Sequence, residues 1–334
     1  MDDKVTPKLK DIKNKLLISL DIGGSLIKIC IITEKNEKSI NDFISSKNIF
    51  EKIDLNQFNL FFTSIQTINF EKLLFPILKD LNDITKIKEI DLTGGGAYKY
   101  NDIFKKTFDI ELVKHDELQS LIYGYEFMNN FNSFYEIEND LIKKLPQEDL
   151  KFPHISANIG SGVSILKVSA NDKYERVGGT LMGGGTLIGL SKLIFGIDDY
   201  DKIIELASKG NNENVDLTMK DFPNNNENEF ENPEISSLGK IHEYIQSGKK
   251  DELKKEDIAL SLIKMISSHI AQYSVIYAEK NNIDTIYYFG SFTKNNFINK
   301  ILHKASKHWN KNIKVRFNCH DGYLGTIGTF LITK

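Results

Sequence analysis

A glycine-rich turn between two apolar stretches occurs twice in this chain of 334 residues. The first copy spans residues 16–33 and the second spans residues 154–168, with glycines in both turns. Two short apolar runs joined by glycines predict a β-hairpin whose turn leaves backbone N–H groups unpaired. Because Asp21 to Lys28 aligns with Asn158 to Ile165, we expect one such hairpin in each half of the chain.

A second pattern is also repeated, in the same order. Residues 88–92 predict a strand that runs into Thr93-Gly94-Gly95-Gly96, with helical spacing from Tyr100 onward. Residues 284–289 run in the same way into Gly290-Ser291, followed by helical spacing through 292–303. Duplication at this scale predicts two similar α/β lobes with a cleft between them. Two glycine turns facing each other across that cleft are suited to hold a polyphosphate.

The repeats divide the chain into a first lobe, residues 1–115, and a second lobe, residues 116–334. Within the second lobe we predict a bridging helix in 116–150 and a mobile surface loop at 211–233, which is rich in asparagine and acidic residues. Residues 254–280 predict a long amphipathic helix, and 321–333 a terminal helix that opens on glycine. The apolar face of the long helix is predicted to hold Ile258, Leu262, Met265, Ile266, His269 and Ile270.

Composition excludes several classes of protein. The net charge of −3 gives no basic surface for a nucleic acid. No apolar run is long enough for a membrane span, and the polar, lysine-rich start does not resemble a secretory signal. The two cysteines, Cys30 and Cys319, and the seven histidines show no spacing typical of metal ligands. We therefore expect a protein of the reducing cytoplasm without a metal held directly by its side chains.

The first glycine turn carries groups suited to phosphate. Gly23 and Gly24 allow close backbone approach, Ser25 adds a hydroxyl and Lys28 a cation. The carboxylate of Asp21 suits a Mg²⁺ ion, reached through water. A plain hairpin turn with a surface lysine explains the same residues equally well.

Three consecutive glycines open a second candidate anion site. Gly183, Gly184 and Gly185 precede Thr186 and Leu187, where helical spacing begins. A helix that starts on glycines presents unpaired N–H groups and the positive end of its dipole. The alternative is a structural loop that needs glycine conformations.

Acidic and basic side chains near the cleft are further candidates. Glu117 follows the mostly apolar residues 110–113, where a carboxylate can accept a proton from an attacking hydroxyl. On spacing alone, Glu117 is more typical of an acid in the first turn of a helix, with Asp116 as N-cap. Arg176 suits bidentate contact with an anion, and an ordinary surface ion pair is equally compatible. Residues 93–99 suit either an anion loop or a close strand-to-helix corner, with Gly94 and Gly95 in the cleft.

Taken in order, these stretches resemble the eukaryotic-type pantothenate kinases and their bacterial type II relatives. The most specific are TGGGAYK at residues 93–99, NIGSGVSILK at 158–167 and GGGTLIGL at 183–190. The resemblance also rests on residues 21–28, 116–118, 175–177, 215–217, 236–239 and 321–325. It implies an α/β fold of the actin-like ATPase superfamily, which contains actin, the heat-shock chaperone ATPases and the sugar kinases.

The activity implied by the resemblance is ATP-dependent phosphorylation of pantothenate, the first step of coenzyme A biosynthesis, with Mg²⁺. Carried over residue by residue, Glu117 is the general base. Ser161, Ser164 and Arg176 bind pantothenate, in a region that holds acetyl-CoA or another acyl-CoA feedback inhibitor in related enzymes. The ATP-binding residues carried over are Asp21, Gly23, Gly24, Ser25, Lys28, Gly183, Gly184, Gly185, Thr186, Leu187, Tyr200 and Ser291.

The resemblance further implies a homodimer in which the partner's Gly325-Thr326 region lies near the pantothenate pocket. The chain departs from the family at Gly290 to Lys294, which replaces the usual Gly-Asn-Phe-Leu-Arg. Two other functions stay open. One is a non-catalytic, regulatory subunit of a heteromeric pantothenate kinase, and the other is a kinase of a different small hydroxyl acceptor.

Overall fold

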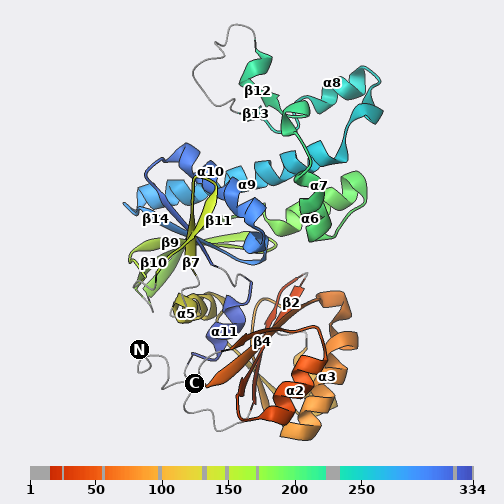
Figure 1. The fold of residues 1–334 in the computed structure, drawn as a ribbon, viewed down its shortest axis with the longest axis vertical. Coiled ribbons are helices and arrows are strands. Elements are labelled where there is room, and N and C mark those ends of the chain that lie inside the picture. Colours follow the sequence, from red (N-terminus) through yellow and green to blue (C-terminus); the bar gives the residue numbers. More distant parts are fainter. Residues whose placement is uncertain are drawn as a thin grey trace.

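The computed structural model describes residues 16–24, 26–54, 57–96, 100–129, 134–146, 150–170, 173–222, 234–318 and 322–332. These residues form two α/β lobes stacked along the long axis of the molecule (Figure 1). Within the described ranges, no helix has both the length and the apolar character needed to cross a membrane.

A six-stranded sheet with the order β3-β4-β2-β1-β5-β6 forms the first lobe. The first glycine hairpin is its centre, with Leu16 opposite Thr33 and Ile22 opposite Ile27, and β5 lies parallel to β1. The strands are β1 (Leu16–Ile22), β2 (Leu26–Glu34), β3 (Glu51–Asp54), β4 (Phe58–Gln66), β5 (Glu89–Thr93) and β6 (Glu111–Lys114).

Three helices bury one face of this sheet: α2 (Lys38–Ser46), α3 (Phe70–Thr85) and α4 (Asn101–Phe108). In α3 the apolar residues recur every three or four positions, which places Leu74, Leu78 and Leu81 on the sheet. The helix ends where Lys86 takes the left-handed conformation. The first hairpin is therefore supported by a closely packed hydrophobic core.

A seven-stranded sheet with the order β11-β10-β9-β14-β15-β7-β8 forms the second lobe. Its strands are β7 (Phe134–Glu138), β8 (Leu141–Lys144), β9 (His154–Ile159), β10 (Val163–Ala170), β11 (Lys173–Thr180), β14 (Thr285–Phe289) and β15 (Lys314–Asn318). β9 and β10 form the second glycine hairpin, and β14 lies parallel to β9 as β5 does to β1. The internal repeat predicted from the sequence is confirmed.

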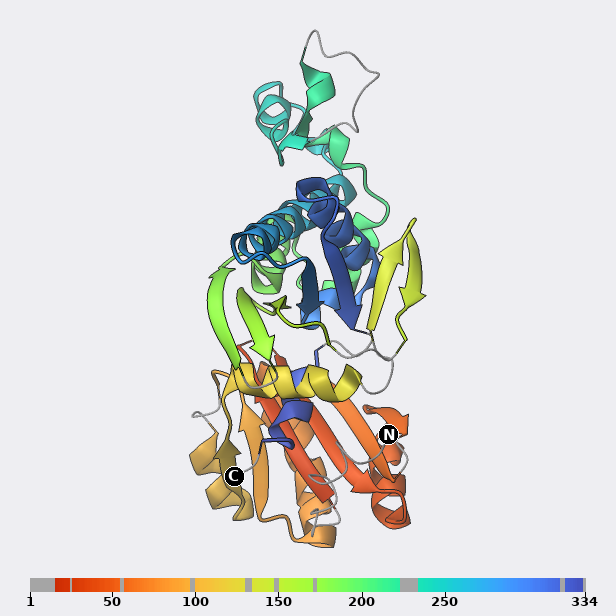
Figure 2. The same cartoon turned by 90° about the vertical axis from the view of Figure 1, so that its left-hand side faces the viewer.

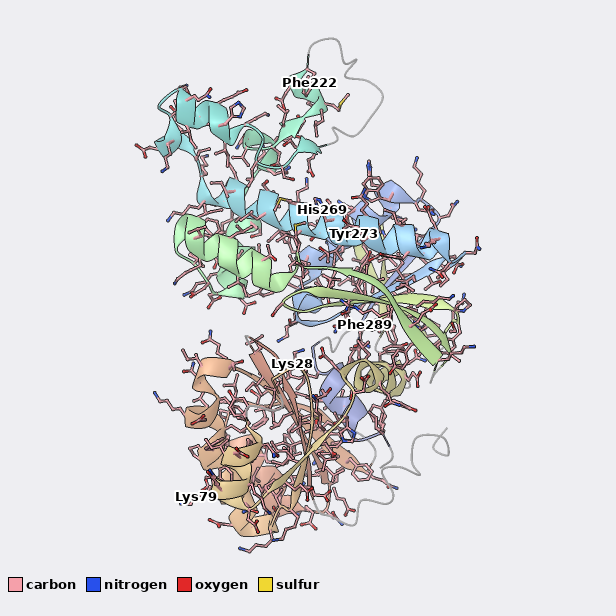
Figure 3. All side chains as sticks on the ribbon, turned by 180° about the vertical axis from the view of Figure 1, so that it is seen from behind. Lys28, Lys79, Phe222, His269, Tyr273 and Phe289 are labelled. Carbon is pink, nitrogen blue, oxygen red and sulfur yellow. The ribbon has the colours of Figure 1, made fainter. Side chains whose placement is uncertain are left out.

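Four helices complete the core of the second lobe: α6 (Gly184–Phe195), α7 (Tyr200–Ala207), α9 (Lys255–Lys280) and α10 (Asn296–Trp309). The predicted long helix is confirmed as α9. Ile258, Leu262 and Ile266 are buried as predicted, but His269 is exposed, and Figure 3 shows it on the outer side of α9. Its ring bonds the carbonyl of Met265, one turn earlier.

Two helices lie between the lobes, α5 (Glu117–Asn129) and α11 (Leu324–Thr329), as Figure 2 shows. They pack with Cys30 and Leu60 of the first sheet and with Leu166 and Phe289 of the second in one shared core. The end of the chain thus returns to the first lobe. The interface between the lobes therefore has its own hydrophobic core.

The predicted bridging helix at 116–150 is too long. α5 ends at Asn129, and β7 and β8 follow as a hairpin on the edge of the second sheet. Only the part of this segment that forms α5 has the helical spacing on which the prediction rested. Alternating burial in β7 is the strand signal that the broader pattern concealed.

The predicted mobile loop at 211–233 is wrong for residues 211–222, while 223–233 lie outside the described residues. β12 (Leu217–Thr218) pairs with β13 (Glu234–Ser236), and α8 (Ile241–Gln246) follows. The buried carboxylate of Asp216 accepts bonds from the Leu238 N–H, the Ser261 hydroxyl and the Asn212 amide. Polar side chains that bond one another order this segment, so its composition was misleading.

Candidate functional site

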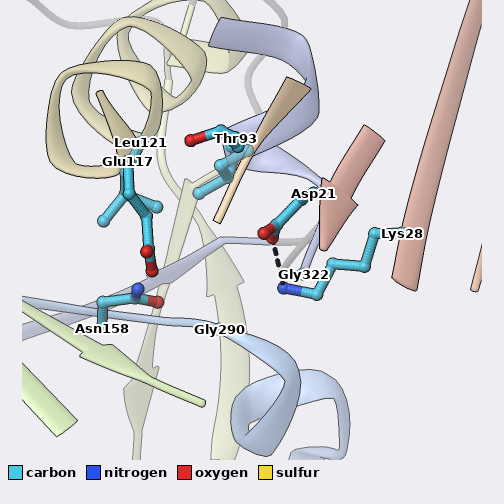
Figure 4. A pocket seen from close by; sticks show the side chains of 10 residues that line it. Asp21, Lys28, Thr93, Glu117, Leu121, Asn158, Gly290 and Gly322 are labelled. Carbon is cyan, nitrogen blue, oxygen red and sulfur yellow. Dashed lines mark hydrogen bonds and ion pairs between the residues drawn. The ribbon is translucent and has the colours of Figure 1, made fainter. Parts of the chain in front are cut away.

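The first glycine hairpin and the end of β9, at Asn158, reach one cleft between the lobes, and its described lining does not include Ser161, Arg176 or Gly184. The first lobe contributes Asp21, Lys28 and Thr93, and the second contributes Asn158 and Gly290. The rest come from the two interlobe helices and from Gly322, which precedes α11. Figure 4 shows Glu117 and Asn158 pointing toward each other across this cleft. The ten lining residues are Asp21, Lys28, Thr93, Glu117, Leu121, Asn158, Gly290, Gly322, Leu324 and Gly325.

An ion pair lies at the base of the first hairpin. Asp21 and Lys28 are directly opposite in the ladder, and their side chains meet with 3.1 Å between Oδ2 and Nζ. Both side chains are more than four-fifths buried, which strengthens their attraction relative to a surface pair. The alternative of a surface lysine on a plain turn is therefore wrong. Gly23 closes the turn by donating to the Leu26 carbonyl, Gly24 is exposed, and Ser25 lies outside the described residues.

The Gly94-to-Gly96 segment is a close-packed corner, as one of the two interpretations predicted. A Cβ on Gly94 would lie 2.6 Å from the Ile22 carbonyl oxygen and 2.7 Å from Oδ1 of Asp21. The N–H of Gly96 donates to the Ile22 carbonyl, so this amide is not available to an anion. The corner thus presses the end of β5 against Asp21 and fixes that carboxylate in the cleft.

Glu117 combines both interpretations made from the sequence. It is the first residue of α5, and the Asp116 carboxylate before it accepts the Gln119 N–H at 2.8 Å as an N-cap does. Glu117 also lines the cleft. Burial raises the pKa of the Glu117 carboxyl, the negative charge of Asp21 raises it further, and Lys28 opposes them. A carboxylate with a raised pKa is a better proton acceptor.

The triple-glycine segment is bonded to the second hairpin turn. The N–H of Gly184 donates to the Gly160 carbonyl at 2.8 Å, and that of Gly185 to the Ser161 carbonyl at 3.0 Å. A Cβ on Gly183 would lie 2.7 Å from the Ser161 oxygen. The prediction that these N–H groups are free for an anion is therefore wrong for Gly184 and Gly185. Because glycine has no Cβ, residues 183–185 can pack directly against the second hairpin turn.

Thr186 and Leu187 hold the start of α6. The Thr186 hydroxyl accepts the Gly183 N–H and donates to the Leu181 carbonyl, while Leu187 is fully buried. Gly183 is buried like Leu187, while Gly184, Gly185 and Thr186 are partly exposed. A role in ATP binding stays a prediction for all of them.

Ser161, Ser164 and Arg176 lie on the β10–β11 side of the second hairpin. Ser161 is exposed in the turn, and Ser164 is paired with Gly179 of β11. A Cβ on Gly179 would lie 3.1 Å from a guanidinium nitrogen of Arg176, so the arginine lies along its own strand toward Ser164. Ser164 and Arg176 are thus neighbours on β10 and β11, and the binding of pantothenate by these three residues stays a prediction.

A hydrogen bond joins that edge to α5. The Tyr174 hydroxyl on β11 donates to Asp116 Oδ1 at 3.2 Å, beside Glu117. Burial and the Asp116 charge raise the pKa of Tyr174 to about 12. Sequence reasoning missed this tyrosine because nothing in the spacing links β11 to the start of α5.

Tyr200 contacts the segment that follows β14, to which Ser291 belongs. The Tyr200 hydroxyl donates to the Phe292 carbonyl at 2.5 Å, and burial raises the pKa of the phenol. Tyr200 therefore ties α7 to the 3₁₀ helix η6 (Ser291–Lys294). Ser291 directly follows the cleft residue Gly290, and its role in ATP binding stays a prediction.

The cleft also contains residues that the sequence did not single out. Asn158 aligns with Asp21 in the internal repeat, which was a usable signal. Gly325 lines the cleft of its own chain and Thr326 is fully buried in the same chain. The implied position of this segment near a partner's pocket stays a prediction. Among the described residues, no three metal-ligating side chains form a cluster.

Comparisons with known proteins agree with this arrangement. Residues 17–332 match the family described as Fumble. The chain is 33% identical to pantothenate kinase from Schizosaccharomyces pombe, over 94% of this chain and 81% of that protein. It is 30% identical to 4'-phosphopantetheine phosphatase from Mus musculus, over 96% of this chain but 41% of that longer protein. Among solved structures, glucokinase from Balamuthia mandrillaris in complex with glucose matches with a TM-score of 0.50 and 10% identity, covering 98% of this chain and 95% of that one. The predicted actin-like ATPase fold is confirmed.

Proposed function

Because this chain belongs to the Fumble family of type II pantothenate kinases, we propose that it transfers the γ-phosphoryl group of ATP to the primary hydroxyl of pantothenate. This is the entry step of coenzyme A biosynthesis. The observation that carries the proposal is Glu117, a carboxylate with a raised pKa in a cleft lined by both lobes.

Glu117 acts as the general base in this proposal. Phosphoryl transfer leaves a protein mainly the work of positioning the reactants and neutralising charge. A base must reach the proton that it removes, and it is most effective when its pKa approaches the working pH. Partial burial and the nearby Asp21 raise the pKa of Glu117 in that direction. Arg176, with Ser161 and Ser164, orients the acceptor from the neighbouring strand edge.

Lys28 and the first hairpin hold the phosphates. The ammonium of Lys28 lies inside the cleft and is already fixed by Asp21 at 3.1 Å. Such a fixed cation needs little reorganisation when the phosphates arrive. Asp21 is the carboxylate that fits Mg²⁺ here, and a single protein carboxylate suits this ion because Mg²⁺ usually keeps several waters and binds substrate phosphates. The ion supplies charge neutralisation for the transferred group when bound.

A panel of acceptors with ATP labelled in the γ-phosphate tests the proposal. Purified protein is incubated with pantothenate, pantetheine, glucose, an amino sugar or no acceptor, and the products are separated. Label in phosphopantothenate alone is the expected result. Label on another acceptor, or ATP consumption independent of any acceptor, would refute the proposed substrate.

The similarity to a 4'-phosphopantetheine phosphatase supplies a second candidate, release of phosphate from 4'-phosphopantetheine. The chain covers 41% of that relative, so the shared part need not hold the phosphatase activity. Incubating the protein with 4'-phosphopantetheine and measuring free phosphate separates the two functions. We expect no phosphate release. A regulatory, non-catalytic subunit is disfavoured because Glu117 and Arg176 are both present.

A further inference from the structure

Lys294 stands at the rim of the cleft on the side of the second lobe. It is the last residue of η6, which begins directly after the cleft residue Gly290. A Cβ on Gly322, another cleft residue, would lie 3.2 Å from Cε of Lys294. The lysine stem therefore lies over Gly322, and its ammonium is 5.5 Å from the centre of the Tyr323 ring.

This ammonium has no ion-pair partner among the residues that the structure describes. Lys28, in contrast, is paired with Asp21. Glu51 and Asp201 act on Lys294 only from a longer range. The side chain of Lys294 is exposed, and partial removal of its ammonium from water lowers its pKa, with the positive charge of Lys28 lowering the pKa further. The ammonium groups of Lys28 and Lys294, one from each lobe, thus repel each other, and an anion bound between them would reduce this repulsion.

The charges in the cleft call for a further cation when a nucleotide binds. Asp21 and Lys28 neutralise each other, and Glu117 adds a negative charge. A triphosphate brings several negative charges even with one Mg²⁺. A site that binds it needs positive charge beyond Lys28, and the flexible stem of Lys294 lets its ammonium move over the rim.

We propose that Lys294 is a second phosphate-binding cation, which contacts the β- and γ-phosphates of a nucleoside triphosphate from the lobe opposite Lys28. The inference rests on the kinase function proposed above, and it adds a residue to the site. Because the nucleotide is then held from both lobes, its binding favours a closer approach of the two lobes.

Nucleotide affinity without any acceptor tests the proposal. AMP, ADP and ATP are titrated, with Mg²⁺, against the wild type and the variants Lys294→Met and Lys294→Arg. Lys79→Met is the matched control, because this exposed lysine lies on the outer side of α3, away from the cleft (Figure 3). A lost charge-assisted hydrogen bond predicts ATP binding weakened about 10- to 100-fold in Lys294→Met.

The pattern across nucleotides decides the outcome. The proposal expects AMP affinity to stay unchanged in Lys294→Met, ADP affinity to fall and ATP affinity to fall most. Lys294→Arg should recover most of the ATP affinity, and Lys79→Met should match the wild type. Unchanged ATP affinity in Lys294→Met, or an equal loss for all three nucleotides, would overturn the inference. The acceptor panel is independent of this result, since a wild type that binds ATP without phosphorylating pantothenate still reports on Lys294.

Discussion

The contact between α5 and α11 leaves no room for a side chain at two glycines. A Cβ on Gly328 of α11 would lie 1.6 Å from the Ser120 carbonyl oxygen, and one on Gly124 of α5 would lie 1.9 Å from the Leu324 carbonyl oxygen. Real Cβ atoms essentially never approach a neighbour within 3.0 Å. Both obstacles are backbone atoms, so no side-chain rotation relieves them. An alanine at either position must therefore push the helices apart by more than an ångström.

The expected cost follows from overpacking. Insertion of a methyl group into a closely packed contact costs about 1–3 kcal/mol, and occasionally more. Since the obstacles are rigid, we expect about 3 kcal/mol for Gly328→Ala. On a scale of about 2–4 °C per kcal/mol, the Tm should fall by roughly 6–12 °C. Catalysis should suffer further, because Glu117 is carried by α5, and a misplacement of about 1 Å can reduce a rate about 100-fold.

Thermal unfolding of Gly328→Ala and Gly124→Ala, followed by circular dichroism, measures the effect. Gly189→Ala is the control, because Gly189 lies exposed in α6 with nothing within 4 Å of an added Cβ. Alanine favours a helix over glycine by about 1 kcal/mol, so the control should keep or raise its Tm. The reasoning fails if Gly328→Ala also melts at or above the wild-type temperature.

Three other substitutions test separate parts of the structure. Glu117→Gln should melt at a higher temperature than the wild type at neutral pH. The folded state raises the pKa of Glu117 above its ordinary value of 4.5, so the wild type loses stability as the pH rises from 4.5 through the folded pKa. Glutamine does not ionise, so the variant escapes this loss. The difference should vanish below pH 4.5, and equal Tm values at neutral pH would contradict it. Tyr174→Phe removes the bond to Asp116 and should lower kcat severalfold at nearly constant KM for ATP, with a stability loss of about 1 kcal/mol. An unchanged kcat would show that this bond does not position Glu117. Asp216→Asn places amide hydrogens against the Leu238 N–H or the Asn212 amide and should cost about 2–3 kcal/mol in urea unfolding, and an unaltered midpoint would count against the network.

The duplicated architecture could be predicted from the sequence because it depends on local patterns. Each glycine hairpin and each strand-to-helix corner is specified by neighbouring residues, so the pattern survives without knowledge of the fold. The ion pair of Asp21 and Lys28 follows from hairpin register in the same way. Asn158 was also predictable in principle, because the repeat aligns it with Asp21.

Contacts between distant segments could not be predicted in this way. The N–H groups of Gly184 and Gly185 bond to residues 160 and 161, across more than twenty positions of the chain. The return of α11 to the first lobe and the bond from Tyr174 to Asp116 are likewise tertiary. Composition also misled where polar groups satisfy one another, as they do around the buried carboxylate of Asp216.

One comparison tests the central claim, that Glu117 accepts the proton of an alcohol while the cleft holds ATP. Wild type and Glu117→Gln are each mixed with ATP and pantothenate in a single turnover, with ATP affinity measured on the same samples. The account predicts phosphopantothenate from the wild type, no detectable product from Glu117→Gln, and similar ATP affinity for both. Product formation by Glu117→Gln at a rate close to that of the wild type would contradict it.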